Sequence, residues 1–471
     1  MNTFNKKSLF VALASLGALG VTGTADAVYV NPDGTGQVLL YPYYTVRNKV
    51  ANSAPFNSLL SVVNSTASAK IVKVRFLEGK NSREVLDFNL YLSAKDVWTT
   101  AIIPVTAAAD AAGIITTDTS CTTPKVGSTA ATATPFVNYA YSGDPAGGSL
   151  DRTTEGYVEI IEMGTLFGKS TTEGYVTHVG GVPADCSAIN STESQRDLTS
   201  PTGGLFGGMT LVNVLAGEDM TSDAVALEQY RQQEFWAIPG SILPDLSQAD
   251  PTWTVFNGFS AVSGTTTTGI DSVSAVLMHR NVMNEFVLDA PTLSSTSWVV
   301  TFPTKRYYYN PAPGQLCGTS QVPCNQVQSL FQRNFVATGA CDDVGVVVWS
   351  REEQKVSTPG GFSPPPPSGA VPALCWEANV ITFNSKNVFG SANTSNVNTA
   401  YSNGWMDVDL LGGLTNGRHK LPTANGTFTG LPVIGFAAQT FNNGTLADAV
   451  TGKLLQSSYG GNFVHKYTPG L

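Results

Sequence analysis

The chain has little charge, few histidines and few cysteines for its length. Of its 471 residues, 13% are charged and the formal net charge is −9, so the basic track that binds nucleic acid is missing. There are only four histidines, and none of them lies near a cysteine pair at metal-ligand spacing. These shortages argue against nucleic-acid binding, against attraction to anionic membrane surfaces and against zinc sites.

Long hydrophobic runs are also missing, except at the start of the chain. The opening MNTFNKKSLFVALASLGALGVTGTADA has Lys6 and Lys7 before an apolar run and small residues around Asp26. This pattern is typical of a secretory signal peptide, here residues 1–27, because a membrane anchor needs about 20 apolar residues. We therefore expect an exported protein that is cleaved after Ala27 and has no transmembrane anchor.

The six cysteines form an even set, as expected for disulfides in an exported chain. Metal binding is the rival interpretation, but no C-x-x-C motif is present. Sequence alone does not select one set of pairs. The simplest set is sequential, and it joins Cys121 to Cys186, Cys317 to Cys324, and Cys341 to Cys375.

Motifs that carry chemistry are absent. The sequence contains no G-x-S-x-G elbow, no H-E-x-x-H pair, no phosphate loop and no dinucleotide fingerprint. The four histidines stand alone in the sequence, so a surface or core role is expected for each unless a triad assembles in space; they are His178, His279, His419 and His465. We predict no catalytic, cofactor-binding or metal-binding residue, and no cofactor.

Strand patterns dominate what is present. Val72, Val74 and Phe76 alternate with Lys73 and Arg75, which predicts a strand with one face in water. A similar alternation follows over residues 86–92, after a turn. Antiparallel strands with one wet face each are typical of a β-sandwich.

The stretch TTEGYVEIIEMG, residues 153–164, contains three carboxylates, and its first six letters return at 171–176. Tyr157, Val158, Ile160 and Ile161 favour a strand. In a strand, Glu155 and Glu159 would lie roughly 13 Å apart and Glu162 would point to the other side. We therefore interpret the three glutamates as structural, and the repeat as a sign of a local hairpin.

The segment VYVNPDGTGQVLLYPYYT, residues 28–45, is apolar on both faces when read as a strand. Such a strand must lie between two layers or pair with a sheet edge. We predict an inner strand of the first sandwich, with donation to a neighbouring copy as the alternative. Tyrosines are dense in this segment and at 307–309. We interpret them as core residues, in preference to aromatic platforms that stack on a sugar ligand.

Helical patterns are few. SDAVALEQYRQQEFW from Ser222 and DSVSAVLMHRNVMNEF from Asp271 have apolar residues at helical spacing. We predict an all-β protein of two immunoglobulin-like or jelly-roll-like β-sandwich domains, with long loops and one or two short helices. The N-terminal sandwich spans 28–225, a helical or loop connection spans 226–270, and the C-terminal sandwich spans 271–471.

Several motifs together resemble a family of uncharacterised exported proteins of Gram-negative bacteria. They are NPDGTGQVLLYPYYT, KVRFLEGKNSREVLDFNLYLSAKDVW, EGYVEIIEMG, WVVTFPTKRYYY and SSYGGNFVHKY. The resemblance implies a β-rich protein of the periplasm or cell surface, and it transfers no site residue.

These observations favour a non-enzymatic structural or adhesive component of the cell surface or extracellular matrix. Its expected partners are further copies of itself or cell-surface polysaccharide. The alternative is a carbohydrate-binding or carbohydrate-cleaving sandwich, and cleavage would need two carboxylates about 5 to 9.5 Å apart in an aromatic groove.

Overall fold

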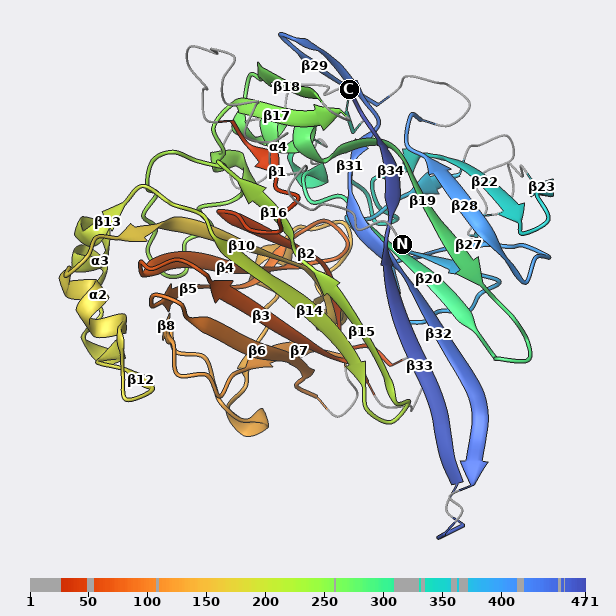
Figure 1. Ribbon diagram of the computed structural model, residues 1–471, viewed down its shortest axis with the longest axis horizontal. Helices are drawn as coiled ribbons and strands as arrows, with labels where there is room; N and C mark the ends of the chain where they lie inside the picture. Colours follow the sequence, from red (N-terminus) through yellow and green to blue (C-terminus); the bar gives the residue numbers. More distant parts are fainter. Residues whose placement is uncertain are drawn as a thin grey trace, which may run out of the picture.

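The structure is a computed structural model that describes residues 27–48, 55–106, 110–257, 260–308, 330–331, 335–356, 362–363, 372–412, 419–447, 450–452 and 454–471. Strands dominate these residues, and four large sheets form two β-sandwiches (Figure 1). The all-β sandwich prediction is therefore confirmed. Of the predicted signal peptide, residues 1–26 lie outside the described residues.

The first sandwich consists of sheet 1 and sheet 2, which face each other across a common core. Sheet 1 contains, in spatial order, β1 (Tyr29–Val30), β16 (Val225–Glu228), β2 (Val38–Thr45), β10 (Glu155–Leu166), β4 (Lys70–Glu78), β5 (Glu84–Leu92) and β8 (Cys121–Thr123), and β13 (Leu198–Thr199) also pairs with β10. Sheet 2 contains β15 (Glu218–Asp223), β14 (Leu205–Asn213), β3 (Asn57–Asn64), β6 (Val97–Pro104), β7 (Ala112–Ile115) and β9 (Thr134–Pro135).

The second sandwich consists of sheet 3 and sheet 4. Sheet 3 contains β23 (Lys355–Val356), β22 (Gly345–Ser350), β28 (Asn403–Asp409), β19 (Met278–Val287) and β31 (Leu431–Pro432), and β34 (Lys466–Pro469) also pairs with β19. Sheet 4 contains β24 (Phe362–Ser363), β27 (Thr394–Val397), β26 (Ala378–Phe383), β20 (Ser295–Thr301), β32 (Ile434–Ala447) and β33 (Leu454–Val464). Four two-stranded sheets complete the described strands. Three are hairpins of consecutive strands: β11 (His178–Val179) with β12 (Val182–Pro183), β17 (Thr252–Asn257) with β18 (Ser260–Thr265), and β29 (Lys420–Thr423) with β30 (Gly426–Thr429); the fourth pairs β21 (Asp342–Asp343) with β25 (Ala373–Leu374), which is distant in the sequence.

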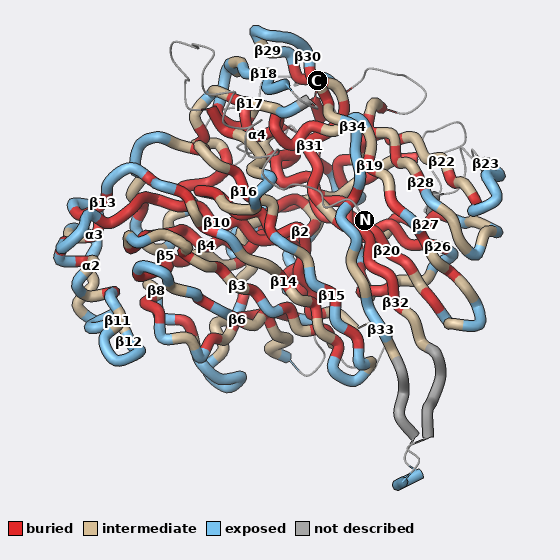
Figure 2. The backbone as a smooth tube through the Cα atoms, in the orientation of Figure 1, coloured by how far each residue is buried: buried red, intermediate tan, exposed pale blue. Residues whose placement is uncertain are grey.

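The two sandwiches share their hydrophobic cores. One cluster joins Val38 and Leu40 of the first sandwich to Trp298 of the second. Another joins Leu39 of the first sandwich to Phe436 of the second. Figure 2 shows the resulting band of buried backbone running across both sandwiches. The cores are thus continuous, and each sandwich covers apolar surface of the other.

Strand β2 lies inside the first sandwich, as its two apolar faces predict. All eight of its residues are buried, and it pairs with β10 on one side and β16 on the other. Its alternate residues Val38 and Leu40 join one core, whereas Leu39, Tyr41 and Tyr43 join the other. The prediction of an inner strand and of core tyrosines in this segment is confirmed.

Three short α-helices are described: α2 (Thr171–Val176), α3 (Ser191–Asp197) and α4 (Gly269–Leu277). None of the helices in the described part of the chain is long and apolar enough to cross a membrane. The predicted helix at 271–286 is half right, because α4 ends at Leu277 and the chain continues directly as β19. Thr268 caps α4 by accepting a hydrogen bond from the Asp271 N–H.

Two other local predictions are wrong. The segment at 222–236 is not helical, since Val225, Ala226 and Leu227 pair with β2 as strand β16. Strand pairing with β1 and β2, together with burial, outweighs the helical spacing of this segment. The second TTEGYV is helix α2 and not a hairpin, although the hairpin β11–β12 follows it.

The prediction that one face of the strand at 70–78 is exposed to solvent is also wrong. Lys70, Lys73 and Arg75 are all buried in β4. The loop after β16 covers this face, because the backbone oxygen of Ile238 accepts from Lys73 at 3.4 Å and that of Ala237 accepts from Asn89 at 2.9 Å. The cover comes from residues far away in the sequence, so the alternation of charge could not reveal it.

Candidate functional site

The three glutamates of the stretch at 153–164 all lie in β10, and all three are buried. Glu155 accepts hydrogen bonds from the hydroxyls of Tyr43 at 2.7 Å and Ser391 at 2.6 Å, and from the N–H of Ala392 at 2.8 Å. Because Ser391 and Ala392 belong to the second sandwich, Glu155 fastens the two sandwiches together. A carboxylate with these partners has little freedom to act on a substrate.

Glu159 forms an ion pair with Arg75 inside the first sandwich. The Arg75 guanidinium lies 2.5 Å from the Glu159 carboxylate and 2.8 Å from that of Glu84. Burial raises the pKa of Glu159, and Arg75 acts in the opposite direction. A neighbouring pair, Arg306 with Asp245 at 3.3 Å, belongs to the same charged layer. Each charged group in this layer is paired with a group of opposite charge, so we interpret the layer as structural.

Glu162 is held by Lys70 and by a backbone turn. The Lys70 ammonium lies 2.7 Å from the carboxylate, and both groups are fully buried. The N–H groups of Thr202 and Gly203 donate to the same carboxylate at 3.0 and 2.9 Å. All three glutamates therefore have strong intramolecular partners.

A fourth carboxyl, Glu377, differs from these three. It is fully buried where residues 377–378 meet residues 79–80 of the first sandwich, and its N–H donates to the backbone oxygen of Lys80 at 3.1 Å. Neither carboxylate oxygen has a hydrogen-bond partner among the described residues. Burial raises the pKa of Glu377 to about 8, against the opposing effect of the nearby Lys305 charge. This group is protonated at neutral pH.

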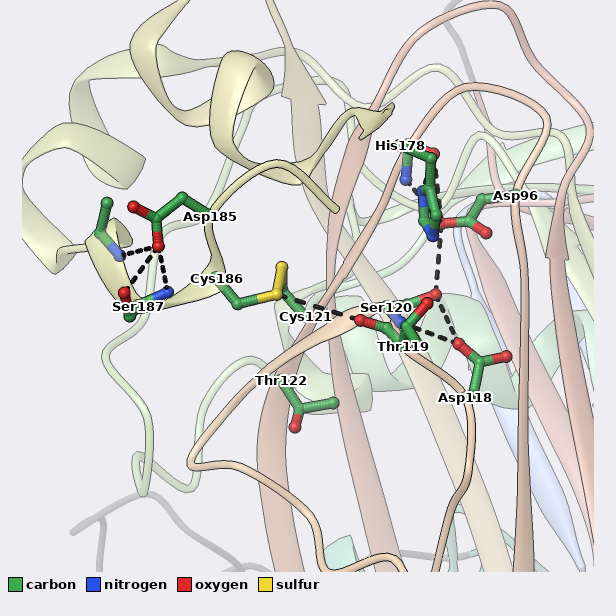
Figure 3. Close-up of a disulfide and its surroundings, with 12 residues drawn as sticks. Asp96, Asp118, Thr119, Ser120, Cys121, Thr122, His178, Asp185, Cys186 and Ser187 are labelled. Atoms are coloured by element: carbon green, nitrogen blue, oxygen red, sulfur yellow. Dashed lines mark hydrogen bonds and ion pairs between the residues drawn. A yellow bond between two sulfur atoms is a disulfide. The ribbon is translucent and has the colours of Figure 1, made fainter. Parts of the chain in front are cut away.

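Ser93, Asp96 and His178 come together in the structure, and the sequence did not reveal this cluster. Figure 3 shows Asp96 and His178 in the surroundings of the Cys121–Cys186 disulfide. The Ser93 hydroxyl lies 2.9 Å from Nδ1 of His178, and the Asp96 carboxylate lies 3.8 Å from the same nitrogen. Ser93 also donates directly to Asp96 at 3.3 Å. In a hydrolase triad the serine and the aspartate use opposite nitrogens of the imidazole. This cluster has a different arrangement, and we interpret it as a loop anchor.

Two of the three sequential disulfides are present in the structure. Cys121 of β8 is bonded to Cys186 (Figure 3). Cys341 is bonded to Cys375. Cys317 and Cys324 lie outside the described residues. Within the described ranges, no group of His, Cys, Asp and Glu side chains is arranged to hold a metal ion.

An open groove of about 600 Å³ crosses the outer face of sheet 2 and is a candidate binding site. Its floor is rich in hydroxyl groups from Ser61 and several threonines, and exposed Leu59 and Phe206 stand beside them. Strands β3, β6, β7, β14 and β15 contribute the remaining lining: Leu60, Thr99, Thr100, Ala101, Ile115, Thr116, Thr117, Gly207, Gly208, Thr210, Thr221 and Asp223. We refer to it as the sheet 2 groove.

The sheet 2 groove has the chemistry of a binding surface. Hydroxyl groups accept and donate hydrogen bonds, and the apolar faces of Leu59 and Phe206 can pack on the C–H faces of a ligand. Asp223 is the one carboxylate among its lining residues, so this lining does not supply the carboxylate pair of a glycosidase. The lining residues are scattered between positions 59 and 223, so no local sequence motif predicts the groove.

Comparisons with protein-family models, with curated proteins and with solved structures gave no match to this chain.

Proposed function

We propose that the protein is a non-enzymatic, exported structural or adhesive component of the cell surface or extracellular matrix, which assembles with further copies of itself. The observation that carries this proposal is the edge of the long hairpin formed by β32 and β33. In sheet 4, β33 pairs with β32 alone among the described strands. Figure 1 shows that this hairpin projects well beyond both sandwiches.

The edge strand β33 carries none of the charged residues and prolines that often prevent strand pairing. Its sequence LLQSSYGGNFV contains no charged residue and no proline over 11 residues. Soluble proteins usually protect such edges with lysine, proline, bulges or a covering segment. A second copy that adds a strand to this edge would satisfy the free backbone groups and bury apolar side chains.

Near its base the hairpin is held against the first sandwich. A Cβ at Gly460 would lie 2.4 Å from the backbone oxygen of Asp219 in β15, so glycine permits this close contact. Strand β15 thus lies against the part of β33 around Gly460. Residues 454–459 extend away from it and supply the edge for assembly.

Sedimentation and electron microscopy of the mature chain over a range of concentrations test this proposal. Tyr459→Lys places a charge on the edge strand, and we expect it to weaken self-association by at least about ten-fold. Tyr139→Lys is the matched control, since both tyrosines are exposed, at 51% and 83%. A wild-type protein that stays monomeric at every concentration, or two variants that assemble equally, would contradict the proposal.

The sheet 2 groove favours a second candidate function, the binding of cell-surface polysaccharide. Its hydroxyl-rich floor and the exposed ring of Phe206 support this candidate. We expect binding to immobilised polysaccharides without release of reducing ends. Phe206→Ala should weaken that binding about ten-fold, whereas Phe463→Ala on the hairpin, with a similar exposure (44% against 41%), should leave it unchanged. Equal behaviour of the two alanine variants would exclude the groove as the site.

A further inference from the structure

Four side chains form one row across sheet 3, on strands β23, β22, β28 and β19 (Figure 1). In the strand register each member of the row lies directly opposite the next. The row consists of Lys355, Trp349, Trp405 and Glu285, and we refer to it as the tryptophan row. The next residues along β28 and β19, Met406 and Phe286, belong to the core, so the row lies on the outer face of the sheet.

The two tryptophans of the row are stacked. Their rings are parallel to within 4° and their centres are 4.0 Å apart, so the pair has one outer face toward β23 and another toward β19. On the β23 side, the Lys355 ammonium lies 5.7 Å from the centre of the Trp349 ring, which is a cation–π contact. On the β19 side, no cation of the described residues lies over Trp405, whose side chain is 39% exposed.

Glu285 supplies a negative charge beside this open face of Trp405. It is exposed on β19, and its carboxylate has no hydrogen bond or ion pair among the described residues. The lysine of the adjacent strand, Lys466, lies opposite Met283, two positions away along β19. A cross-strand aromatic pair stabilises a sheet by itself, but it needs no free carboxylate beside it. An open aromatic face next to a carboxylate has the chemistry of a cation site.

The surrounding charge also favours a cationic partner. Asp407 and Asp409 follow Trp405 at alternate positions of β28, so they lie on the same face as the tryptophan row. The chain as a whole has a formal net charge of −9. Charge complementarity therefore favours a basic protein at this face over a copy of this acidic chain, whereas assembly through β33 depends on strand pairing and not on charge.

We propose that the tryptophan row binds an arginine side chain of a basic partner protein. The guanidinium lies on the open face of Trp405, and its N–H groups donate to the Glu285 carboxylate. A guanidinium is planar, stacks on aromatic rings and donates to a carboxylate through two N–H groups, which an ammonium does not match. The tryptophan pair then lies between two cations, Lys355 and the bound arginine. This site is separate from the sheet 2 groove and from the edge of β33, and it does not depend on the function proposed above.

The test uses the full mature chain, with N-acetylarginine amide as the probe and the isotope-labelled indole N–H signals in NMR as the readout. Trp405→Phe identifies the signal of Trp405. N-acetylcitrulline amide is the matched control, because its planar end has the same shape and no charge. We expect the arginine probe to shift the Trp405 signal and to bind about ten-fold more tightly than the citrulline probe.

Three results of this titration would overturn the proposal. They are an unchanged Trp405 signal, equal binding of the arginine and citrulline probes, and a shift produced by methyl glucoside alone. The last result would identify the row as a platform for a sugar ring.

Glu285→Gln tests the carboxylate. It keeps the size of the side chain and breaks no contact among the described residues, so we expect the variant to fold. It should bind the arginine probe about ten-fold more weakly and the citrulline probe as the wild type does. Glu353→Gln, in the exposed turn between β22 and β23, removes the same charge and should retain the preference for arginine.

A preference for arginine that survives Glu285→Gln, or that is lost equally in Glu353→Gln, would contradict the assignment of Glu285. Sedimentation of Glu285→Gln should match that of the wild type. Weaker self-association of this variant would make a second copy the occupant of the row, and the proposal of a basic partner protein would be wrong.

Discussion

The hexapeptide TTEGYV occurs twice, 18 positions apart, and the two copies have different structures. In the first copy Thr153 and Thr154 end a 3₁₀ helix, Glu155 begins strand β10, and all six residues are buried. The second copy is the α-helix α2, in which only Thr172 and Val176 are buried. The same six residues thus form the junction of a 3₁₀ helix and a strand in the core, and an α-helix at the surface.

The residues around each copy account for the difference. Before the second copy, Ser170 accepts a hydrogen bond from the N–H of Glu173, and this cap starts the helix. Arg152 occupies the corresponding position before the first copy, and there β2 and β4 flank the strand on both sides. Thr172 and Val176 are four residues apart, so in a helix they share the one face that packs. Capping and strand pairing therefore outweigh the intrinsic preference of the hexapeptide.

The largest expected difference between the copies is at their glycine. A Cβ at Gly156 would lie 2.0 Å from the backbone oxygen of Leu77, so Gly156→Ala forces β10 and β4 apart. We expect a loss of about 3 kcal/mol in the free energy of unfolding. Gly174→Ala meets nothing within 4 Å and should stabilise α2 by about 0.5–1 kcal/mol. Urea unfolding of both variants measures the two free-energy changes. Equal unfolding midpoints for Gly156→Ala and Gly174→Ala would contradict the expected difference between the copies.

The glutamates should differ next. Glu155→Gln replaces one of the oxygens that accept from Tyr43, Ser391 and Ala392 with an N–H₂ donor. We expect it to destabilise the protein by about 2 kcal/mol while leaving any binding activity intact. Glu173→Gln removes only a charge from the first turn of α2, which is worth about 0.5 kcal/mol. Loss of a measured activity in a normally folded Glu155→Gln variant would restore a functional role for this carboxylate.

The tyrosines should show the smallest difference. Tyr157 is fully buried and donates to the hydroxyl of Ser82 at 2.7 Å, so Tyr157→Phe should cost about 1 kcal/mol. Tyr175 is half-buried on α2, and Tyr175→Phe should change stability by less than about 0.5 kcal/mol. Thermal unfolding of the two variants, side by side, gives the comparison. A greater effect at Tyr175 would show that α2 contributes more to stability than its burial suggests.

The sequence predicted those parts of the fold that are determined by the residues of one short segment. Strand β2 is apolar on both faces, so its place between two layers follows from its own residues. The cap at Ser170 and the spacing S-x-x-E to Glu173 were also in the sequence, and they would have predicted helix α2.

Features that depend on distant contacts were not predictable. The charged face of β4 is buried because residues 237–238, more than 150 positions away, cover it. The sheet 2 groove combines residues from several strands, so no local spacing marks it. His279 was interpreted as an isolated histidine, and its stacking on Tyr467 becomes visible only in the structure.

The buried carboxyl of Glu377 makes the joining of the two sandwiches a proton-binding reaction. In the unfolded chain this group ionises near its ordinary pKa of 4.5, whereas in the folded protein its pKa is about 8. Between these values the folded state holds a proton that the unfolded state releases, so the free energy of unfolding decreases as pH rises through this window. Refolding near pH 6 to 7 should therefore take up a proton at this residue, and Glu377→Gln should abolish that uptake. Through this group, a fall in pH from about 8 towards 4.5 stabilises the folded protein, in which the two sandwiches share their cores.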